Sequence, residues 1–534
     1  MKSRYIATLL LGGFLSFTAC TGGFESDNKI KGGFSDELKE IDFQKLTAPF
    51  ATIQSGIYFN YALAGLNWVW QVVQALNHDM FSGYFMDPVP KFMVHSACYN
   101  LNVGWTNAAW QYTYGYIYTE VQKAEKNFEG DSRLNGYLGL TQILKVELMH
   151  RIADTYGPLV YHKSGETPRV YSLQEAYTQF FADLDEGQKM IHAYLEAGGD
   201  NYKFKEHDML TYGKTMKDWL KFANSLRLRL AMRISNVDAA TAKAETLKAL
   251  YDSNGVLEDD KETIAVSSNT YVNPLNGVAG WGEVYMGASM ASIINGYEDP
   301  RGREWYNTAS LEGYKDQLLG IPMGLPMTGA NANLYGACSS LNTNTIGEKT
   351  PAILMTAAEV WLLRAEAALR GYTNENAQSC YEKGVSTSFG QWDCGDASSY
   401  LASDRTPADY KDVASKGTVG KDMDALITVS PKWDETATPE VKLEKIITQK
   451  WLACWPESYE AWAEQRRTGY PRLFKVQNNA SAGAIDTEAM IRRLPFSTDV
   501  AGNNPAQYAE LCSKLNGTDN GGTRLWWDAG KNNF

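Results

Sequence analysis

Two glutamates on one predicted helix have the spacing of a catalytic acid pair. Glu460 and Glu464 stand four residues apart, on either side of Trp462, in the stretch SYEAWAEQRRTGYPRLF. On a helix this spacing puts Cβ atoms about 5–6 Å apart, close to the roughly 5–5.5 Å between the carboxyls of a retaining glycosidase. Glycosidase acids, however, lie on opposite sides of a bound sugar, which neighbours on one helical face cannot do. We therefore predict that these glutamates, with Arg466 and Arg467, form an ion-pair face with partners on other helices.

The sequence contains no other motif for catalysis, metal binding or nucleic-acid binding. It has no G-x-S-x-G, no Walker A sequence, no H-E-x-x-H and no G-x-G-x-x-G before a helix. Its 6 histidines lack metal-ligand spacing, and its 7 cysteines form no C-x-x-C pair. The net charge of −12 without any Lys/Arg-rich run argues against nucleic acid, because phosphate binding needs a positive surface. We predict no metal and no cofactor.

The N-terminus has the pattern of a bacterial lipoprotein signal. Two basic residues precede an apolar run, 6–17, that is too short to span a bilayer, and small residues lead into Cys20. We predict that residues 1–19 are removed, that Cys20 carries a lipid, and that the Gly-rich stretch 20–35 is a flexible tether. Phe17 replaces the usual Leu before such a cysteine, so ordinary secretion with cleavage nearby is the alternative.

Helical periodicity dominates the rest of the chain, 36–534, which we expect to form one mainly α domain. In the stretch 136–156, apolar residues recur every four positions and form one stripe, and Gly157-Pro158 ends the pattern. Similar patterns joined by short connections predict antiparallel helix pairs. They cover 173–195, 216–234, 238–252, 356–371, 375–389, 442–454 and 458–468.

One helix pair matches the tetratricopeptide repeat. The repeat places an aromatic or small residue at fixed offsets along 34 positions. These offsets fall on Trp361, Ala365, Ala377, Tyr381 and Gly384, while Phe389 replaces the final proline. We predict a superhelical scaffold of diverged helix pairs stacked side by side, with Trp361 and Trp219 in its core.

Two segments interrupt the helical pattern. Residues 78–106 and 266–350 are rich in Gly, Asn and Pro and carry several aromatic residues. Loops of this length in a folded protein are usually functional. We therefore predict that these two segments form an irregular, ligand-binding half.

Several longer motifs together resemble the RagB/SusD family of outer-membrane nutrient-binding lipoproteins. They are LMHRIADTYGPLVY, EVWLLRAEAALRGY, IITQKWLACWPESYEAWAEQRRTGYPRLF and RRLPFSTDVAGNNPAQY with GGTRLWWD, in the family's order. The resemblance implies tetratricopeptide-like helix pairs that hold a loop-rich binding half. It also implies a lipid-anchored protein on the outer-membrane surface that captures oligosaccharide, is not an enzyme, and serves a SusC-like TonB-dependent transporter.

The two irregular segments supply candidate ligand-binding residues. Aromatic rings stack on the C–H faces of sugars, and polar side chains bond the hydroxyls. The candidate rings are Phe81, Tyr84 and Trp105 in the first segment and Trp281, Tyr285 and Tyr335 in the second, with Asp79, Asn276 and Asn333 as polar candidates. Trp281 lies next to glycine, which favours display, whereas Trp105 begins a helical run that also suits a core residue.

Three alternative functions stay open on the sequence. The same scaffold can capture peptides, because aromatic rings suit either ligand. A surface glycosidase is the second alternative, and a structural lid without a ligand of its own is the third.

Overall fold

The computed structural model describes residues 43–58, 67–199, 215–267, 272–325, 329–413, 420–530 and 533–534. The chain divides into two units, Met1–Lys45 and Leu46–Phe534, and the account below concerns the second. The predicted signal peptide (1–19), the lipidated Cys20 and the tether (20–35) lie outside the described residues.

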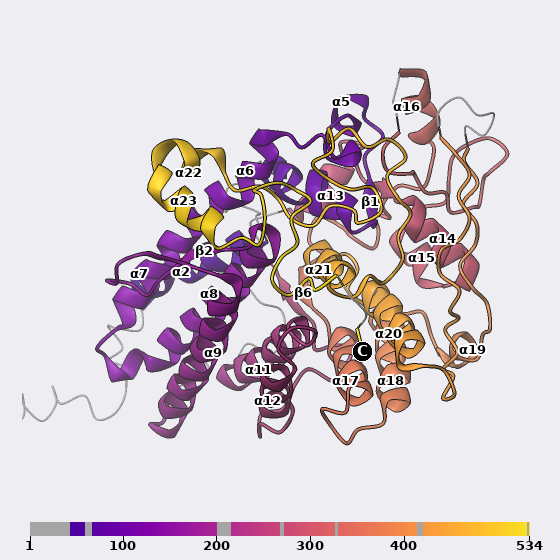
Figure 1. The fold of residues 1–534 in the computed structure, drawn as a ribbon. Coiled ribbons are helices and arrows are strands. Elements are labelled where there is room, and N and C mark those ends of the chain that lie inside the picture. Colours follow the sequence, from indigo (N-terminus) through magenta and orange to yellow (C-terminus); the bar gives the residue numbers. More distant parts are fainter. Residues whose placement is uncertain are drawn as a thin grey trace, which may run out of the picture. The chain divides into compact units, whose positions relative to one another are not determined.

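Long helix pairs form the scaffold, as the periodicity predicts (Figure 1). The helix α8 (Asn135–Tyr156) packs along α9 (Leu173–Glu196), and the hairpin of β2 (Leu159–Tyr161) and β3 (Arg169–Tyr171) connects them. The two helices approach closely because glycines meet at their contact: a Cβ on Gly139 would lie 2.5 Å from the carbonyl oxygen of Gly187. The next pair is α11 (Met216–Arg233) and α12 (Ala239–Leu250).

The tetratricopeptide-like pair is α17 (Ala357–Leu369) and α18 (Ala377–Gln391), which lie side by side (Figure 1). Tyr381 is fully buried, and a Cβ on Gly384 would lie 2.7 Å from Leu362 Cγ, so a small residue is needed there. Trp219 is also in the core, as predicted. Trp361 is not: it is half-buried, and its indole N–H donates to the backbone oxygen of Glu258 at 2.9 Å.

The helices α20 (Pro439–Ala453) and α21 (Ser458–Thr468) complete the scaffold and contain the acid pair of the opening motif. Glu460 and Glu464 are 3% and 2% exposed, and both bind Arg233 of α11 and Lys450 of α20. Burial by itself raises the pKa of Glu460, but the two cations outweigh burial and hold that pKa at about 2. The predicted ion-pair face is therefore confirmed, and it is buried.

One of the two predicted arginine partners has a different role. Arg467 binds Glu464 at 2.6 Å and Glu366 of α17 at 2.7 Å. Arg466 instead donates to the backbone oxygens of Asp154 and Arg492, and its guanidinium lies 3.5 Å from the centroid of the Trp462 ring. The prediction of an ion-pair role was wrong for Arg466, because its side chain leaves the face that carries the two acids.

The remaining elements are short. Near the N-terminal side are α2 (Phe43–Ile57), α3 (Asn67–Trp70), the π-helix η2 (Gln71–His78), α4 (Asp79–Phe81), β1 (Phe85–Met86), α5 (Pro90–Met93), the 3₁₀ helix η3 (Ser96–Cys98), α6 (Val103–Tyr112), the π-helix η4 (Thr113–Ile117), α7 (Tyr118–Phe128) and the 3₁₀ helix η5 (Ser132–Leu134). Further along are β4 (Ile264–Val266), α13 (Pro274–Ala279), β5 (Tyr285–Met286), α14 (Ala288–Tyr297), α15 (Arg301–Trp305), α16 (Gly329–Tyr335), β6 (Ala352–Met355), α19 (Ser398–Leu401), α22 (Thr498–Asn503) and α23 (Pro505–Ser513).

The two segments predicted to be irregular meet through backbone pairing. Strand β1 pairs with β5 in antiparallel register, with Phe85 opposite Met286 and Met86 opposite Tyr285. The other two-stranded sheets pair β2 with β3 and β4 with β6. The paired residues are about 200 positions apart in the chain, so the segments 78–106 and 266–350 are joined directly, as a shared binding region requires.

Within the described residues, no helix combines the length and apolar character needed to cross a bilayer.

Candidate functional site

Trp281 is displayed on the surface, as its glycine neighbours suggest. Its side chain is 48% exposed. The residue follows the end of α13 in a turn, where its N–H donates to the backbone oxygen of Val278 at 3.0 Å. Gly282 comes next with φ +77°, a conformation that favours glycine. The turn therefore ends the helix and leaves the indole outside it.

Three of the predicted rings are core residues in this structure and not displayed ones. Tyr84 is fully buried, and its hydroxyl donates to the backbone oxygen of Trp451. Phe81 is 1% exposed and packs 5.2 Å from the Trp462 ring. Tyr335 is fully buried, with its hydroxyl 2.9 Å from both carboxylate oxygens of Asp412. Because scaffold groups cover them, we do not carry these rings into the proposed binding surface.

The three polar candidates differ in their exposure to solvent. Asp79 is 1% exposed and accepts a hydrogen bond from Gln74, and burial raises its pKa to about 7. Asn276 is half-buried, and its amide donates to the backbone oxygen of Ile346 at 2.8 Å. Asn333 is exposed on α16. Of the three, Asn333 is the one that the structure leaves open to solvent.

Two further rings are half-buried. Trp105, near the start of α6, packs edge-on against Phe92 and His95, with centroids 5.7 and 4.9 Å away. Tyr285 lies on β5, four residues after Trp281. Among the predicted rings, Trp281 and Tyr285 lie four residues apart in one stretch of the chain, and Trp105 packs against Phe92 and His95.

A row of exposed rings was missed by the sequence reasoning. Trp68 on α3 is 46% exposed, and Tyr116 on η4 is 53% exposed. Tyr112 lies between them: its ring centroid is 6.2 Å from that of Trp68, edge-on, and 5.7 Å from that of Tyr116, stacked. The available signal was the i, i+4 spacing of the two tyrosines, which puts both rings on one helical face.

Two π-helices support this row. Tyr116 lies on η4, and η2 follows directly after α3 and packs against α6. A π-helix is rare and often marks a functional site. The extra residue in such a turn changes the direction in which the following side chains point, so local geometry here differs from that of a regular helix.

We place Trp281 on the same surface as this row because the elements that carry these residues pack together. Helix α3, which carries Trp68, packs against α13, which leads into Trp281. One turn after Trp68, the amide of Gln71 donates to a carboxylate oxygen of Glu283, two residues after Trp281. We call Trp68, Tyr112, Tyr116 and Trp281 the aromatic surface.

A group of polar side chains lies beside Trp281. We call Gln71, Asp87 and Glu283 the polar patch. Burial, with a smaller contribution from the nearby Glu283, raises the pKa of Asp87 to about 8. Burial also raises the pKa of Glu283. The aromatic surface and the polar patch together provide ring faces for stacking and oxygen atoms that accept hydrogen bonds.

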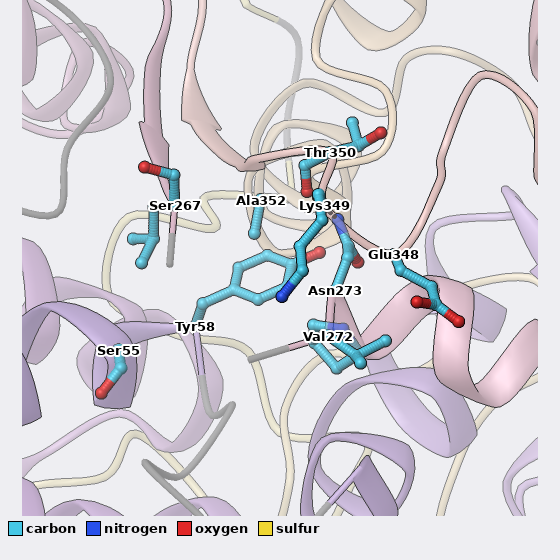
Figure 2. Close-up of a pocket in the computed structure, with 11 residues that line it drawn as sticks. Ser55, Tyr58, Ser267, Val272, Asn273, Glu348, Lys349, Thr350 and Ala352 are labelled. Carbon is cyan, nitrogen blue, oxygen red and sulfur yellow. Dashed lines mark hydrogen bonds between the residues drawn. The ribbon is translucent and has the colours of Figure 1, made fainter. Parts of the chain in front are cut away.

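Three small enclosed cavities between described residues do not offer an alternative ligand site. Figure 2 shows one of them, where the Tyr58 ring and the Lys349 side chain project into the same space, beside Asn273 and Thr350. Its volume of ≈ 20 Å³ has room for about one water molecule. A sugar ring does not fit there.

Two open depressions on the scaffold are larger. One, of ≈ 500 Å³, is lined by Trp361, but the guanidinium of Arg364 lies 3.7 Å from the centroid of that ring and covers one face. The other, of ≈ 670 Å³, is lined by the last two residues, Asn533 and Phe534. Neither contains a row of exposed rings among its described lining residues.

Comparison with known proteins gives consistent matches over nearly the whole chain. The family model described as SusD-like, "Susd and RagB outer membrane lipoprotein", matches residues 27–528. None of the curated protein sequences matches this chain. A SusD homologue from Bacteroides vulgatus is 55% identical with a TM-score of 0.89, and the match covers 93% of this chain and 100% of that one.

Two further solved structures are similar. A chitin-binding SusD homologue from Flavobacterium johnsoniae is 37% identical, with a TM-score of 0.86 and coverage of 92% of this chain and 100% of that chain. A SusD-like protein from Bacteroides thetaiotaomicron is 30% identical, with a TM-score of 0.82 and coverage of 90% and 98%. The mainly helical architecture is shared with all three.

Proposed function

The chain belongs to the SusD-like family of outer membrane lipoproteins, and we propose that it captures an oligosaccharide on its aromatic surface and delivers it to a SusC-like TonB-dependent transporter. The family consists of binding proteins of the outer membrane, and a homologue that is 37% identical binds chitin. Both facts support a glycan as the ligand of this chain. Delivery to a transporter and lipid anchoring through Cys20 are parts of the proposal.

The observation that carries the proposal is the row of exposed rings. Trp68, Tyr112 and Tyr116 follow one another at 6.2 and 5.7 Å, a spacing similar to the length of a sugar unit. Covering about 40 Å² of each ring contributes about 1 kcal/mol at 25 cal/mol per Å². The three exposed rings, Trp68, Tyr116 and Trp281, then contribute about 3 kcal/mol before the cost of association is counted, which suits a weak complex that must release its ligand.

The structure gives a physical reason to treat the protein as a binder. The acid pair that the sequence singled out by its spacing, Glu460 and Glu464, is buried under Arg233 and Lys450 and lies on the scaffold. A sugar cannot enter between these carboxylates without breaking several ion pairs. We therefore propose that the protein holds its ligand without cleaving it.

The first experiment is a calorimetric titration of the full chain, purified in detergent, with plant and host oligosaccharides, chitin fragments and mixed peptides. We expect a glycan to bind without release of reducing sugar, and Trp281→Ala to weaken that binding. Tyr251→Ala is the matched control, because Tyr251 is 69% exposed and lies at the end of α12.

Other results of this titration would support one of the three alternative functions. Binding of peptides but not of glycans would move the proposal to peptide capture on the same scaffold. Release of sugar that Glu460→Gln abolishes would support a glycosidase. No ligand at all would leave a structural lid, and the transporter partnership would then be tested by purifying the chain from outer membranes with its partners.

A further inference from the structure

Trp361, which the repeat pattern places in the core, is instead held at the surface of α17, where it is half-buried. Two contacts fix its ring: the indole N–H donates to the backbone oxygen of Glu258 at 2.9 Å, and the guanidinium of Arg364 lies 3.7 Å from the ring centroid. Arg364 is itself held, because it pairs with Glu258 at 2.5 Å and its Nε donates to Glu375 at 3.0 Å. The tryptophan is thus immobilised beside solvent.

The ring lines an open depression of ≈ 500 Å³, within the roughly 300–1,000 Å³ of small-molecule sites. The loop that begins at Glu258 forms one wall. The carboxylate of Glu262 closes this loop into a turn, because it accepts from the backbone N–H groups of Glu258 and Asp259 at 2.6 and 3.2 Å. The loop also lies tightly against α18, since a Cβ on Gly390 would be 2.4 Å from a carboxylate oxygen of Asp260. The wall is therefore held in place before any ligand arrives.

Helix α18 supplies a second wall with unused polar groups. Lys383 and Ser386 lie one turn apart on this helix, line the depression and are exposed. Among the described residues, neither side chain has a hydrogen-bond or ion-pair partner. On the loop, Asp259 is exposed and Asp260 is half-buried, and no described cation forms an ion pair with either. The depression therefore offers donors on the helix and acceptors on the loop.

The charges of the described residues around the depression nearly cancel. Two of its four carboxyls, those of Glu258 and Glu262, already pair with cations of the scaffold. The other two share the depression with the ammonium of Lys383. An anion would be repelled by the carboxyls, and an apolar ligand would leave charged groups desolvated without partners. A neutral ligand with many hydroxyls suits the depression better, because each hydroxyl both donates and accepts.

We propose that this depression is a second carbohydrate site, which takes one or two neutral sugar units against the indole of Trp361. Lys383 and Ser386 donate to sugar hydroxyls, and Asp259 accepts from them, in hydrogen bonds that the charged groups strengthen. These residues lie on none of the elements that carry the aromatic surface, so the inference goes beyond the proposed function. Two sites on one chain would hold a long polysaccharide at two points, which raises the overall affinity without new contacts at either site.

The tryptophan favours a sugar over other neutral polar ligands. It gives a charged depression one flat apolar surface, and a sugar has the matching combination of a C–H face and surrounding hydroxyls. Because the ring is already fixed, little conformational freedom is lost when a ligand packs on it. A lysine side chain of a peptide is the main competitor, since cations also pack against indole rings, and the test therefore includes one.

The test reads the depression and the aromatic surface in one sample. The full chain carries 5-fluorotryptophan, and substitution by phenylalanine at Trp361 and at Trp281 assigns the two fluorine NMR signals. The probes are cellotetraose, maltotetraose and chitotetraose, with tetralysine and tetragalacturonate as charged counterparts. We expect at least one neutral tetramer to shift the Trp361 signal with a millimolar dissociation constant, and neither charged tetramer to match it. Lys383→Met should raise that constant about five-fold.

Lys432→Met is the matched control, because Lys432 is 52% exposed and does not line the depression. It should leave the dissociation constant unchanged, and the unfolding midpoint checks that each variant is folded. A Trp361 signal that no neutral tetramer shifts, or a shift that is the same in Lys383→Met, would overturn the inference. If tetralysine shifts the signal at lower concentration than every neutral tetramer, the assignment to a sugar is wrong.

The Trp281 signal reports separately on the proposed function. If a tetramer shifts the Trp281 signal and leaves that of Trp361 in place, the second site is refuted and glycan capture on the aromatic surface stands. If only the Trp361 signal shifts, the second site stands and the aromatic surface is contradicted.

Discussion

The phenol rings of Tyr112 and Tyr116 stack on each other one helical turn apart, with centroids 5.7 Å apart and planes at 22°. Tyr112 is half-buried and meets Trp68 edge-on, whereas Tyr116 is 53% exposed. The inner ring thus supports the outer one, and the outer one is open to a ligand. This arrangement turns a helix face into a platform, and it leads to the first prediction.

Replacing Tyr116 by alanine should weaken glycan binding with little effect on stability. Loss of about 40 Å² of stacking area corresponds to about 1 kcal/mol, or roughly five-fold in the dissociation constant. Calorimetry measures the affinity and thermal unfolding the stability. Tyr251→Ala, at an exposed position on another helix, should change neither. Unchanged binding in Tyr116→Ala would remove this ring from the site.

Replacing Arg233 by methionine should destabilise the scaffold strongly. The guanidinium bridges Glu460 and Glu464 of α21 and lies 3.3 Å from Asp154 of α8, and all four side chains are buried. Removing one partner of a buried ion pair leaves uncompensated charge and typically costs 3–5 kcal/mol. The urea midpoint of unfolding measures the effect.

The control for Arg233 is an ion pair on the surface. Arg405 and Glu298 are 2.9 Å apart but 56% and 62% exposed. Exposed pairs contribute about 0–1 kcal/mol, so Arg405→Met should shift the midpoint little. Equal effects of the two substitutions would show that the buried network does not hold the helices together.

Replacing Asp87 by asparagine should stabilise the protein most at alkaline pH. In the unfolded chain this carboxyl ionises near pH 4, whereas in the folded protein its pKa is about 8. Between these values the folded state binds one more proton, so stability falls as the pH rises, by up to about 1.4 kcal/mol per pH unit. The asparagine variant does not lose stability in this way as the pH rises, and its side-chain oxygen can still accept the hydrogen bond from the Val89 N–H.

Urea unfolding at pH 5, 6.5 and 8 tests this. The midpoint of the variant should exceed that of the wild type by a margin that grows with pH. Burial also raises the pKa values of Asp79 and Glu147 to about 7, but both groups are present in both proteins and cancel in the comparison. A constant margin across the pH range would contradict the raised pKa.

Replacing Gly139 by alanine should separate α8 from α9. Its Cβ would lie 2.5 Å from the backbone oxygen of Gly187, which cannot move without shifting the helix. Overpacking of this kind typically costs 1–3 kcal/mol. Gly502 provides the control, because a Cβ added there would meet no heavy atom of the described chain within 4 Å. Gly502→Ala should therefore be neutral or slightly stabilising, and similar stability of both variants would show that the α8–α9 contact can relax.

Much of the scaffold could be predicted from the sequence because its signals are local. The apolar stripe of a helix is formed by residues three or four positions apart, so it can be recognised in a short stretch of sequence. The predicted stretches 136–156 and 216–234 agree with α8 and α11 to within one residue at each end. The small residue at Gly384 and the buried ring of Tyr381 follow from the repeat pattern in the same way. The ion-pair role of the acid pair followed from helix geometry and the charges beside it, whereas its burial was seen only in the structure.

Only the tertiary structure decided which rings face the solvent. Phe81, Tyr84 and Trp281 all stand in Gly-rich stretches and look alike in the sequence, but the partners that cover the first two come from α20 and α21, more than 350 residues away. Trp281 stays half exposed, because a turn ends α13 before it. Burial depends on what packs against a residue, and that is a property of distant parts of the chain.

The same reason explains the missed row and the polar patch. Trp68 and Tyr112 lie in separate helical stretches, and their contact requires that the elements of this region, α3, η2 and α6, pack together. The pairing of β1 with β5 brings the stretch that follows Met86 beside the stretch that precedes Tyr285. The sequence by itself determined the helices, the family and the acidic character of the chain, since these depend on residue order and composition. The ligand surface depended on long-range packing, which brings residues nearly 200 positions apart into one site.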